Sequence, residues 1–444
     1  MNRRTFLMST AAAGAVRASA LASPNDTVRI ACVGVRGQGQ SHIQVYGRMK
    51  NVEVAAVCDV DQNILNDRAA LVEKIFKKKP ATYVDVRKLL EDKSIDVVSI
   101  ATPNHWHTLM AIWALDAGKD VYLEKPCSYN MYECRQLMAA ARKHPDRIIQ
   151  HGTNSRSGVA IRDGLTKMKE GLIGDVYLAR GLCFKWRPSI GHAPVEAPPP
   201  ELNHELWTGP APMKPFTRNR YHYNWHWFWD FGNGDLGNQG IHEVDIARWG
   251  LGVRYPTRVT AAGGKFMFED DQETPNTLTA LYEFDAPGTP SGKKMMEFSV
   301  RPWMTNHEGG IGDGRNPDGK LRDRNTVGNL FYGTKGYLAI EWYRKYAFYL
   351  GEEQEPGPTM TQEGNNWANF IDVVRSRDTS QQNAPIEEGA ISCTLVHLAN
   401  ISYQLGRSIR FDEKTWSCPG DAEATALFTR RTGYRKPYVV PKLA

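Results

Sequence analysis

Residues 28–39 read VRIACVGVRGQG, a short apolar run that ends in a glycine-rich turn. The run up to Val33 predicts a buried strand, and the residues after the turn predict a helix. In such a unit Gly34 makes the tight turn, and Gly39 lets the helix pack close to the strand. The free N–H groups at the start of the helix favour a negatively charged pyrophosphate.

The turn departs from the G-x-G-x-x-G pattern at its middle position, which is Arg36. Either Gly37 supplies the close approach of the backbone to a phosphate, or Arg36 itself contacts the phosphate. Gln38 opens the expected helix and belongs to the same candidate site. Because glycine-rich turns are common, the interpretation depends on context: a strand precedes this turn and a helix follows it.

An acidic residue stands 20 positions beyond Gly39, at the end of a second apolar run over 52–58. A carboxylate in that place accepts hydrogen bonds from the ribose hydroxyls of a dinucleotide and repels a 2′-phosphate. Asp59 therefore predicts NAD rather than NADP as cofactor. The alternative is that Asp59 is only a turn residue, and Asp61 is the second candidate for the ribose contact.

The rest of the chain predicts two unlike domains. Apolar runs over 96–101, 120–123 and 147–150 alternate with helical patterns over 110–117 and 132–143. This alternation is typical of a doubly wound parallel sheet, and it predicts an α/β Rossmann domain over 25–150. Beyond it, strands are expected near 175–186, 258–267, 277–284, 294–303 and 337–342, and helices near 241–251, 366–376 and 387–405.

Strands grouped together, with helices set apart, favour an α+β domain with an open, mainly antiparallel sheet covered on one face. We assign this domain to 151–415. The remaining residues, 416–444, form a C-terminal arm with Arg430, Arg431 and Arg435 that packs on the body or on a partner subunit.

The first 22 residues are interpreted as a signal peptide outside the fold. Arg3 and Arg4 precede Phe6 and Leu7, and A-x-A-like cleavage sites follow at 18–22. Paired arginines in this setting resemble a twin-arginine signal. This pattern predicts an exported, periplasmic protein; the alternative is an ordinary N-terminus that is not exported.

The bulk composition excludes several classes of protein. The chain has 444 residues and a net charge of +6. The densest basic run, 77–79, is better explained as a solvated helix end than as a nucleic-acid patch. Seven cysteines, an odd number without CxxC spacing, indicate neither a disulfide framework nor a zinc site. No apolar run is long enough to span a bilayer.

Two further segments carry a family resemblance: ATPNHWH at 101–107 and EKP at 124–126. Together with the glycine turn they resemble the Gfo/Idh/MocA family of oxidoreductases. Segments at 206–212, 240–249 and 331–336 follow in the family's order, so the resemblance covers essentially the whole mature chain. It implies an NAD-binding domain, a second domain that holds the substrate, and assembly into a dimer or tetramer through the open sheet face.

The resemblance also implies roles for individual residues. Cofactor contacts are expected from Thr102, Pro103, Asn104, His107, Glu124 and Lys125, and Pro126 is expected to be cis. The segment 150–156 faces nicotinamide and substrate, which makes Asn154 and Arg156 candidate substrate residues, and His105 of the 101–107 segment is a further candidate. Lys125 is the catalytic lysine, and chemistry supports this: a lysine partly out of water, near a positive ring, has a lowered pKa and can exchange a proton with a hydroxyl.

A second catalytic position is expected at Asn238 and His242. They lie four apart near a helix start, so both can face the cleft. The family commonly has aspartate where this chain has Asn238; asparagine can orient an imidazole but supplies no charge. Asp245, one helical turn further on, could partly compensate. The alternative is that His242 is a core histidine.

The segment 221–231 is dense in aromatic residues. Trp225 and Trp227 are candidates for stacking on the apolar face of a sugar ring, although aromatic side chains also simply build cores. The glycine-rich loop at 308–314 lacks a strand-to-helix context and is expected to be a lid or a surface loop.

Three functions remain open on this sequence. The first is an NAD(H)-dependent oxidoreductase that transfers hydride between a tightly bound nicotinamide and a carbinol or keto group of a sugar or polyol. The second is a glycoside hydrolase that uses transient oxidation, elimination and re-reduction. The third is a non-catalytic sugar-binding relative.

Overall fold

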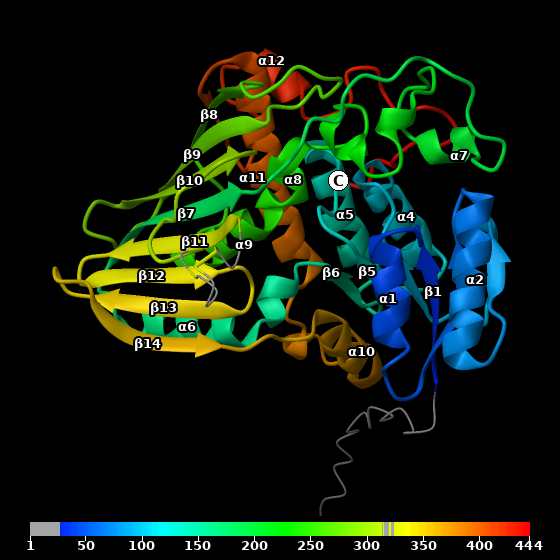
Figure 1. Ribbon diagram of the computed structural model, residues 1–444, viewed down its shortest axis with the longest axis horizontal. Helices are drawn as coiled ribbons and strands as arrows, with labels where there is room; N and C mark the ends of the chain where they lie inside the picture. The colour runs from blue at the N-terminus through cyan, green and yellow to red at the C-terminus, as the bar shows by residue number, and fades with distance from the viewer. Residues whose placement is uncertain (1–26, 313, 315–318, 321–323) are drawn as a thin grey trace, which may run out of the picture.

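A computed structural model describes residues 27–312, 314, 319, 320 and 324–444. The expected signal peptide lies outside these residues. Two sheets stand side by side with helices packed around and between them (Figure 1). Among the described residues, no helix combines the length and the apolar character needed to cross a membrane.

The first sheet has six parallel strands in the order β3-β2-β1-β4-β5-β6. This confirms the doubly wound arrangement. Its elements in chain order are β1 (Val28–Val33), α1 (Gln38–Tyr46), β2 (Val52–Cys58), α2 (Gln62–Phe76), β3 (Ala81–Tyr83), α3 (Val86–Leu90), β4 (Val97–Ile100), η1 (Asn104–Trp106), α4 (His107–Asp116), β5 (Asp120–Leu123), α5 (Met131–Lys143) and β6 (Ile149–His151).

Local capping explains where two of these helices begin. The Asp61 carboxylate accepts hydrogen bonds from the backbone N–H groups of Asn63 and Ile64, which makes it the N-cap of α2. Asn130 caps α5 through the N–H of Glu133. Asp61 therefore has a structural role beside the cavity described below, where its carboxylate also lies 3.2 Å from the His222 ring.

The second sheet has nine strands in the order β14-β13-β12-β11-β7-β10-β9-β8-β15. Its pairs are antiparallel except β7 with β10, as expected for a mainly antiparallel sheet. The strands are β7 (Val176–Phe184), β8 (Arg258–Gly264), β9 (Thr277–Asp285), β10 (Lys293–Arg301), β11 (Thr326–Gly333), β12 (Gly336–Glu341), β13 (Lys345–Leu350), β14 (Glu355–Thr361) and β15 (Ile409–Arg410).

Helices α6, α9 and α11 pack against this sheet, whereas Tyr177, with 55% of its surface exposed, lies on its open side. The remaining elements are η2 (Asn154–Ser157), α6 (Val159–Lys169), α7 (His204–Thr208), η3 (Arg218–Arg220), η4 (Asn224–Trp227), α8 (Gly234–Asn238), α9 (Gly240–Leu251), α10 (Asn366–Ser376), η5 (Thr379–Gln381), α11 (Ile386–Leu405) and α12 (Ala422–Ala426).

The two halves of the chain interleave more than their sequence order indicates. Phe370 and Val373 of α10 belong to the same apolar cluster as β1 and α1 of the first sheet. Helix α11 packs on both α5 and β8. A buried ion pair between Arg156 and Asp245, with Nε and Oδ2 2.8 Å apart, joins η2 to α9. The contacts of α10 and α11 fix the first sheet against the second domain, and the ion pair holds the segment that follows β6 to α9.

The C-terminal arm packs on the body of the same chain. Arg430 stacks over the ring of Tyr129, 3.7 Å from its centroid, and the Arg435 guanidinium pairs with Glu205. The backbone N–H of Tyr132 donates to the Phe428 carbonyl. Of the two placements expected from the sequence, the structure therefore shows the arm on its own subunit.

Candidate active site

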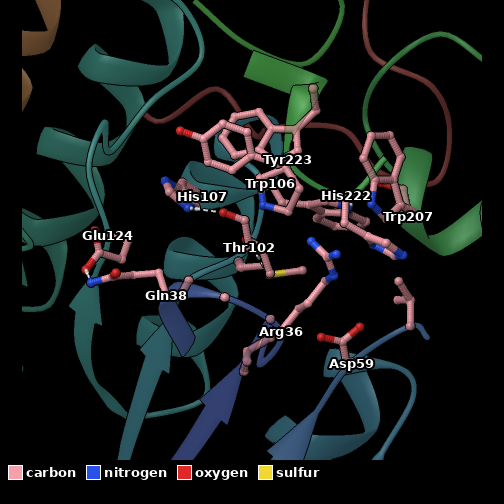
Figure 2. Close-up of a pocket in the computed structure, with 18 of the residues that line it drawn as sticks. Arg36, Gln38, Asp59, Thr102, Trp106, His107, Glu124, Trp207, His222 and Tyr223 are labelled. Atoms are coloured by element: carbon pink, nitrogen blue, oxygen red, sulfur yellow. Dashed lines mark hydrogen bonds between the residues drawn. The ribbon is translucent and has the colours of Figure 1, made fainter. Parts of the chain in front are cut away.

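A cavity of about 430 Å³ opens at the carboxyl ends of β1, β2, β4 and β5. This is the place where open α/β sheets bind ligands. Residues of α7, η4 and α8 line it from the opposite side, so both domains contribute (Figure 2).

The glycine turn forms the floor of this cavity. Gly34 has φ +76°, and a Cβ there would lie 2.7 Å from the Thr102 nitrogen. A Cβ on Gly39 would lie 2.2 Å from the Gly34 carbonyl oxygen, whereas one on Gly37 would meet nothing within 4 Å. Gly34 and Gly39 thus make the tight turn and the close helix packing, and Gly37 faces open space at the start of α1. A pyrophosphate fits this arrangement.

Arg36 extends from the turn into the cavity, between Asp59 and His222 (Figure 2). Burial lowers the pKa of His222, and the positive charge of Arg36 lowers it further. Both alternatives for the altered turn therefore have structural support: Gly37 leaves room for a close approach, and Arg36 offers a cation at the cavity.

Asp59 holds the turn and lines the cavity. Its Oδ2 accepts the Val35 N–H at 2.8 Å, and its Oδ1 accepts the Asp61 N–H at 3.1 Å. Each oxygen keeps a further lone pair for a ribose hydroxyl. Burial raises the pKa of Asp59 to about 6, although hydrogen bonds from the Asp61 and Val35 N–H groups oppose the shift.

This pKa predicts that NAD binding weakens in acid. Ribose hydroxyls donate to the ionised carboxylate. NAD affinity should therefore be at its maximum when the pH is well above 6, and it should fall as the pH drops through about 6 and the carboxylate is protonated. We expect Kd to rise about tenfold for each further pH unit. Titration calorimetry from pH 4.5 to 8 measures this. Asp59→Asn keeps an acceptor for the Val35 N–H and should remove the pH step; a step of equal size in that variant would assign it to another group.

His107 joins the two loops that carry the family motifs. Its Nδ1 lies 2.7 Å from the Pro126 carbonyl oxygen. Its Nε2 lies 2.7 Å from the Thr102 carbonyl oxygen (Figure 2). Burial lowers the pKa of His107 to about 4, so the neutral ring donates to only one of the two carbonyls. Thr102, Pro103 and His107 line the cavity, and the Lys125–Pro126 peptide is cis, as expected.

Glu124 is the centre of a buried network beneath the cavity. Its Oε1 accepts from Gln38 at 3.1 Å and lies 3.0 Å from His42 Nε2, and its Oε2 accepts the Lys125 N–H. Burial alone would raise the pKa of Glu124, but the His42 hydrogen bond and the Lys125 charge lower it to about 2. The Glu124 carboxylate is therefore ionised and fixed. The sequence analysis missed His42, whose position on α1 carries no motif.

Lys125 stands at the end of β5 and reaches across to the second domain. Its Nζ donates to the backbone carbonyl of Asn238 at 2.6 Å. Burial lowers the pKa of Lys125, and nearby Lys185 lowers it further, while Glu124 acts in the opposite direction. A lysine in this state exchanges a proton more readily near neutral pH than a solvated one.

The structure corrects the expected partnership between Asn238 and His242. The two lie on separate helices, α8 and α9, which meet at Gln239. The Asn238 amide points to Asp235 Oδ1 at 3.4 Å, and it is the Asn238 backbone carbonyl that holds Lys125. Asp245 is paired with Arg156, and its charge has only a minor effect on His242, where it raises the pKa of the ring against burial.

His242 is buried against the ring of Tyr343, with centroids 4.7 Å apart. Its Nδ1 has no hydrogen-bond partner in the described part of the chain. Burial lowers the pKa of His242 well below its usual range, and the Lys125 charge adds to this effect. The imidazole is therefore neutral, in the environment that the core-histidine alternative described.

The expected substrate residues divide into two groups. Trp225 lines the cavity, whereas Trp227 is buried beneath the Arg187 guanidinium. His105 is packed between Trp207 and Phe231, and the amide of Asn104, which was expected to contact the cofactor, donates to Asn233. Trp227, His105 and Asn104 therefore lie in the wall and are not among the residues that line the cavity. Asn154 accepts from the Tyr122 hydroxyl, and Arg156 is held by Asp245 and Glu388.

Three cavity residues were not predicted: Trp207 of α7, Tyr223 just before η4 and Lys185 just beyond β7. Trp207 and Tyr223 face the cavity (Figure 2), and the Lys185 Nζ donates to Gln239 Oε1 at 2.8 Å. The Trp106 indole N–H donates to the Trp207 carbonyl, which fastens α7 over the first sheet. The density of aromatic residues was the available signal, but it did not indicate which of them face inward.

Two family models match the chain. Residues 28–152 match an oxidoreductase family model with an NAD-binding Rossmann fold. Residues 171–263 and 329–440 match the model for the C-terminal alpha/beta domain of the same oxidoreductase family.

Curated relatives are similar over a shorter stretch. A glycosyl hydrolase family 109 protein of Shewanella baltica is 34% identical over 127 residues, 28% of either chain. An alpha-N-acetylgalactosaminidase of Shewanella oneidensis is 30% identical over 162 residues, 35% of either chain. The chain thus aligns with about a third of these relatives' length.

Solved structures share the fold over most of the chain. The WlbA dehydrogenase of Bordetella pertussis, in complex with NADH and UDP-GlcNAcA, superposes with a TM-score of 0.62 at 16% identity and covers 87% of this chain and 99% of its own. An aldose-aldose oxidoreductase of Caulobacter crescentus gives a TM-score of 0.63 at 16% identity, over 87% of this chain and 100% of its own.

Proposed function

Because the chain belongs to the Gfo/Idh/MocA family of oxidoreductases, with its NAD-binding Rossmann domain, we propose that it oxidises or reduces a sugar or polyol using a tightly bound NAD(H). One observation carries the proposal: Lys125, whose pKa is lowered, lines the same cavity as the glycine turn and Asp59. A proton carrier and a dinucleotide cradle in one cavity are what hydride transfer at a carbinol needs.

The residues of the chain divide this work. The start of α1 holds the pyrophosphate, with Gly37 giving access and Arg36 supplying charge, and Asp59 binds the ribose. When bound, the nicotinamide accepts a hydride from the substrate carbon or returns one to it. Glu124 and the Asn238 carbonyl fix the backbone and the Nζ of Lys125, and Lys125 takes the hydroxyl proton or gives it back.

The substrate lies on the side of the second domain. Trp225 and Tyr223 supply flat apolar faces of the kind that stack on sugar rings, and Lys185 supplies a hydrogen-bond donor. His242, neutral and buried close to Lys125, is a hydrogen-bonding residue in this proposal and not a charged base.

Glycoside hydrolysis is the second candidate. The observation that favours it is the similarity to family 109 glycosyl hydrolases and an alpha-N-acetylgalactosaminidase, which covers about a third of the chain. Oxidation beside a glycosidic bond acidifies the adjacent C–H, and elimination, water addition and re-reduction then cleave the bond without net redox change. The same cavity residues serve both reactions.

A panel of free sugars, polyols and aryl glycosides distinguishes the candidates by product. A keto sugar or polyol with a change in the redox state of the cofactor supports the oxidoreductase. A released sugar with no net change in the cofactor supports the glycosidase. Binding of the panel members without any product would favour the third possibility, a non-catalytic sugar-binding protein.

Location and assembly are further parts of the proposal. The twin-arginine pattern supports export of a folded, cofactor-loaded protein to the periplasm. The open face of the large sheet carries exposed Tyr177, Leu281 and Met295, which supports a homo-oligomer formed through this face.

A further inference from the structure

Behind the Lys125 turn lies a buried cluster of two thiols and an imidazole: Cys127, Cys393 and His151. Their ligand atoms lie within 4.8 Å of one another, and the two Sγ atoms are 3.6 Å apart. All three side chains are completely buried. They come from the turn after β5, from the end of β6 and from α11, so the cluster joins the two domains.

The His151 ring presents a free ligand atom at this place. Its Nδ1 lies 3.3 Å from the Thr153 hydroxyl, while its Nε2, with essentially no exposed surface, has no hydrogen-bond partner in the described part of the chain. A buried polar atom without a partner is costly unless something occupies it. The backbone supports this ring position, because the His151 N–H donates to the Ala384 carbonyl at 2.9 Å.

Helix α11 is shaped to admit the ring. A Cβ at Gly389 would lie 2.4 Å from His151 Nδ1, so only glycine allows the close approach there. Gly389 and Cys393 are four residues apart and share one face of the helix. The same helix face therefore receives the imidazole and presents a thiol to it.

The three side chains suit one kind of ligand. Two cysteine sulfurs 3.6 Å apart, with an imidazole nitrogen within 4.8 Å of both, are a set of soft ligands for a thiophilic metal ion.

We propose that Cys127, His151 and Cys393 form a structural site for a thiophilic divalent cation such as Zn²⁺, which fastens the turn of the catalytic lysine to α11. Binding releases the thiol protons to solvent, and two thiolates with a neutral imidazole and one divalent cation give an uncharged site. That balance suits an enclosed position. Three protein ligands leave the fourth position of a tetrahedral ion to water or a small anion.

The proposal departs from the expectation of no metal, which rested on cysteine spacing. Sequence spacing does not reveal ligands that three separate elements bring together. The role of the site is positional: Cys127 follows Lys125 by two residues, and α11 belongs to the second domain.

Metal analysis of the full chain tests the proposal. The protein is produced in zinc-supplemented medium and purified without chelator, and metal is measured by mass spectrometry. We expect about one equivalent of zinc per chain. Cys393→Ser should lose it, whereas Cys418→Ser, which removes a buried thiol outside the cluster, should retain it.

Cobalt substitution gives a readout on the wild-type protein alone. Replacement of the metal by Co²⁺ should produce thiolate-to-cobalt absorption, which is lost when the protein is treated with a chelator. Three results would overturn the proposal: no zinc as purified or after refolding with equimolar Zn²⁺, equal zinc in the Cys393→Ser variant, or a Cys127–Cys393 disulfide in the purified protein.

Discussion

A Lys125→Ala variant is expected to lose about 10²- to 10⁴-fold in kcat, the usual contribution of a positioned general acid–base group. Lys125 is the side chain whose lowered pKa and place beside the glycine turn suit it to exchange a proton with a substrate hydroxyl. Without it, that proton must pass to or from water. The measurement is turnover of the substrate found in the panel.

Bound NAD should remain in this variant, because the glycine turn and Asp59 are untouched. Lys125→Arg is the matched control: it keeps a positive charge at the same place but does not release its proton near neutral pH. We expect it to be as slow as the alanine variant. Activity restored by arginine would show that charge alone matters, and full activity of Lys125→Ala would remove Lys125 from the mechanism.

A Gly39→Ala variant is expected to lose NAD binding and much of the stability of the first domain. Its Cβ would lie 2.2 Å from the Gly34 carbonyl oxygen, and both are backbone positions that cannot swing away. Relief requires α1 to move from β1, which opens the turn that holds the pyrophosphate. Thermal unfolding and NAD titration measure the two effects, and we expect a fall in Tm of several degrees.

Gly37→Ala is the matched control two positions earlier. A Cβ there meets nothing within 4 Å, so the free protein should unfold at the wild-type temperature. If Gly37 gives the backbone its close approach to the phosphate, NAD affinity falls all the same. If Arg36 makes the phosphate contact instead, affinity is retained in Gly37→Ala and falls in Arg36→Ala. Wild-type stability and affinity in Gly39→Ala would contradict the assignment of this turn.

Much of the fold could be predicted because its signals are local. The run from Val28 to Val33, the turn after it and Asp59 lie within one βαβ unit, so sequence spacing fixes their spatial relation. The same holds for the turn that carries Lys125. Strands β3, β11, β13, β14 and β15 were missed. Strand β14 holds prolines and a glycine and is largely exposed, which weakens the alternating pattern, and β3 and β15 have only three and two residues.

The site was harder to predict where it depends on tertiary packing. The spacing of Asn238 and His242 indicated one helix face, but α8 ends at Asn238 and a new helix starts after Gln239, so the two residues do not share one helix. His105 and Trp227 lie beside cavity residues in sequence yet are packed in the wall. Other parts of the site depend on contacts between residues that are far apart in sequence, so no sequence spacing describes them. They are the contact of Lys185 with Gln239, the contact of His42 with Glu124, and the cysteine–histidine cluster.

The central claim is that the cavity holds a resident NAD(H), and one measurement tests it directly. The protein is purified without added cofactor and denatured, and the supernatant is assayed for NAD and NADP. The account predicts a stoichiometric amount of NAD(H) and little NADP(H). Absence of retained nucleotide, together with no binding of added NAD, would contradict the claim and favour a sugar-binding protein without redox chemistry.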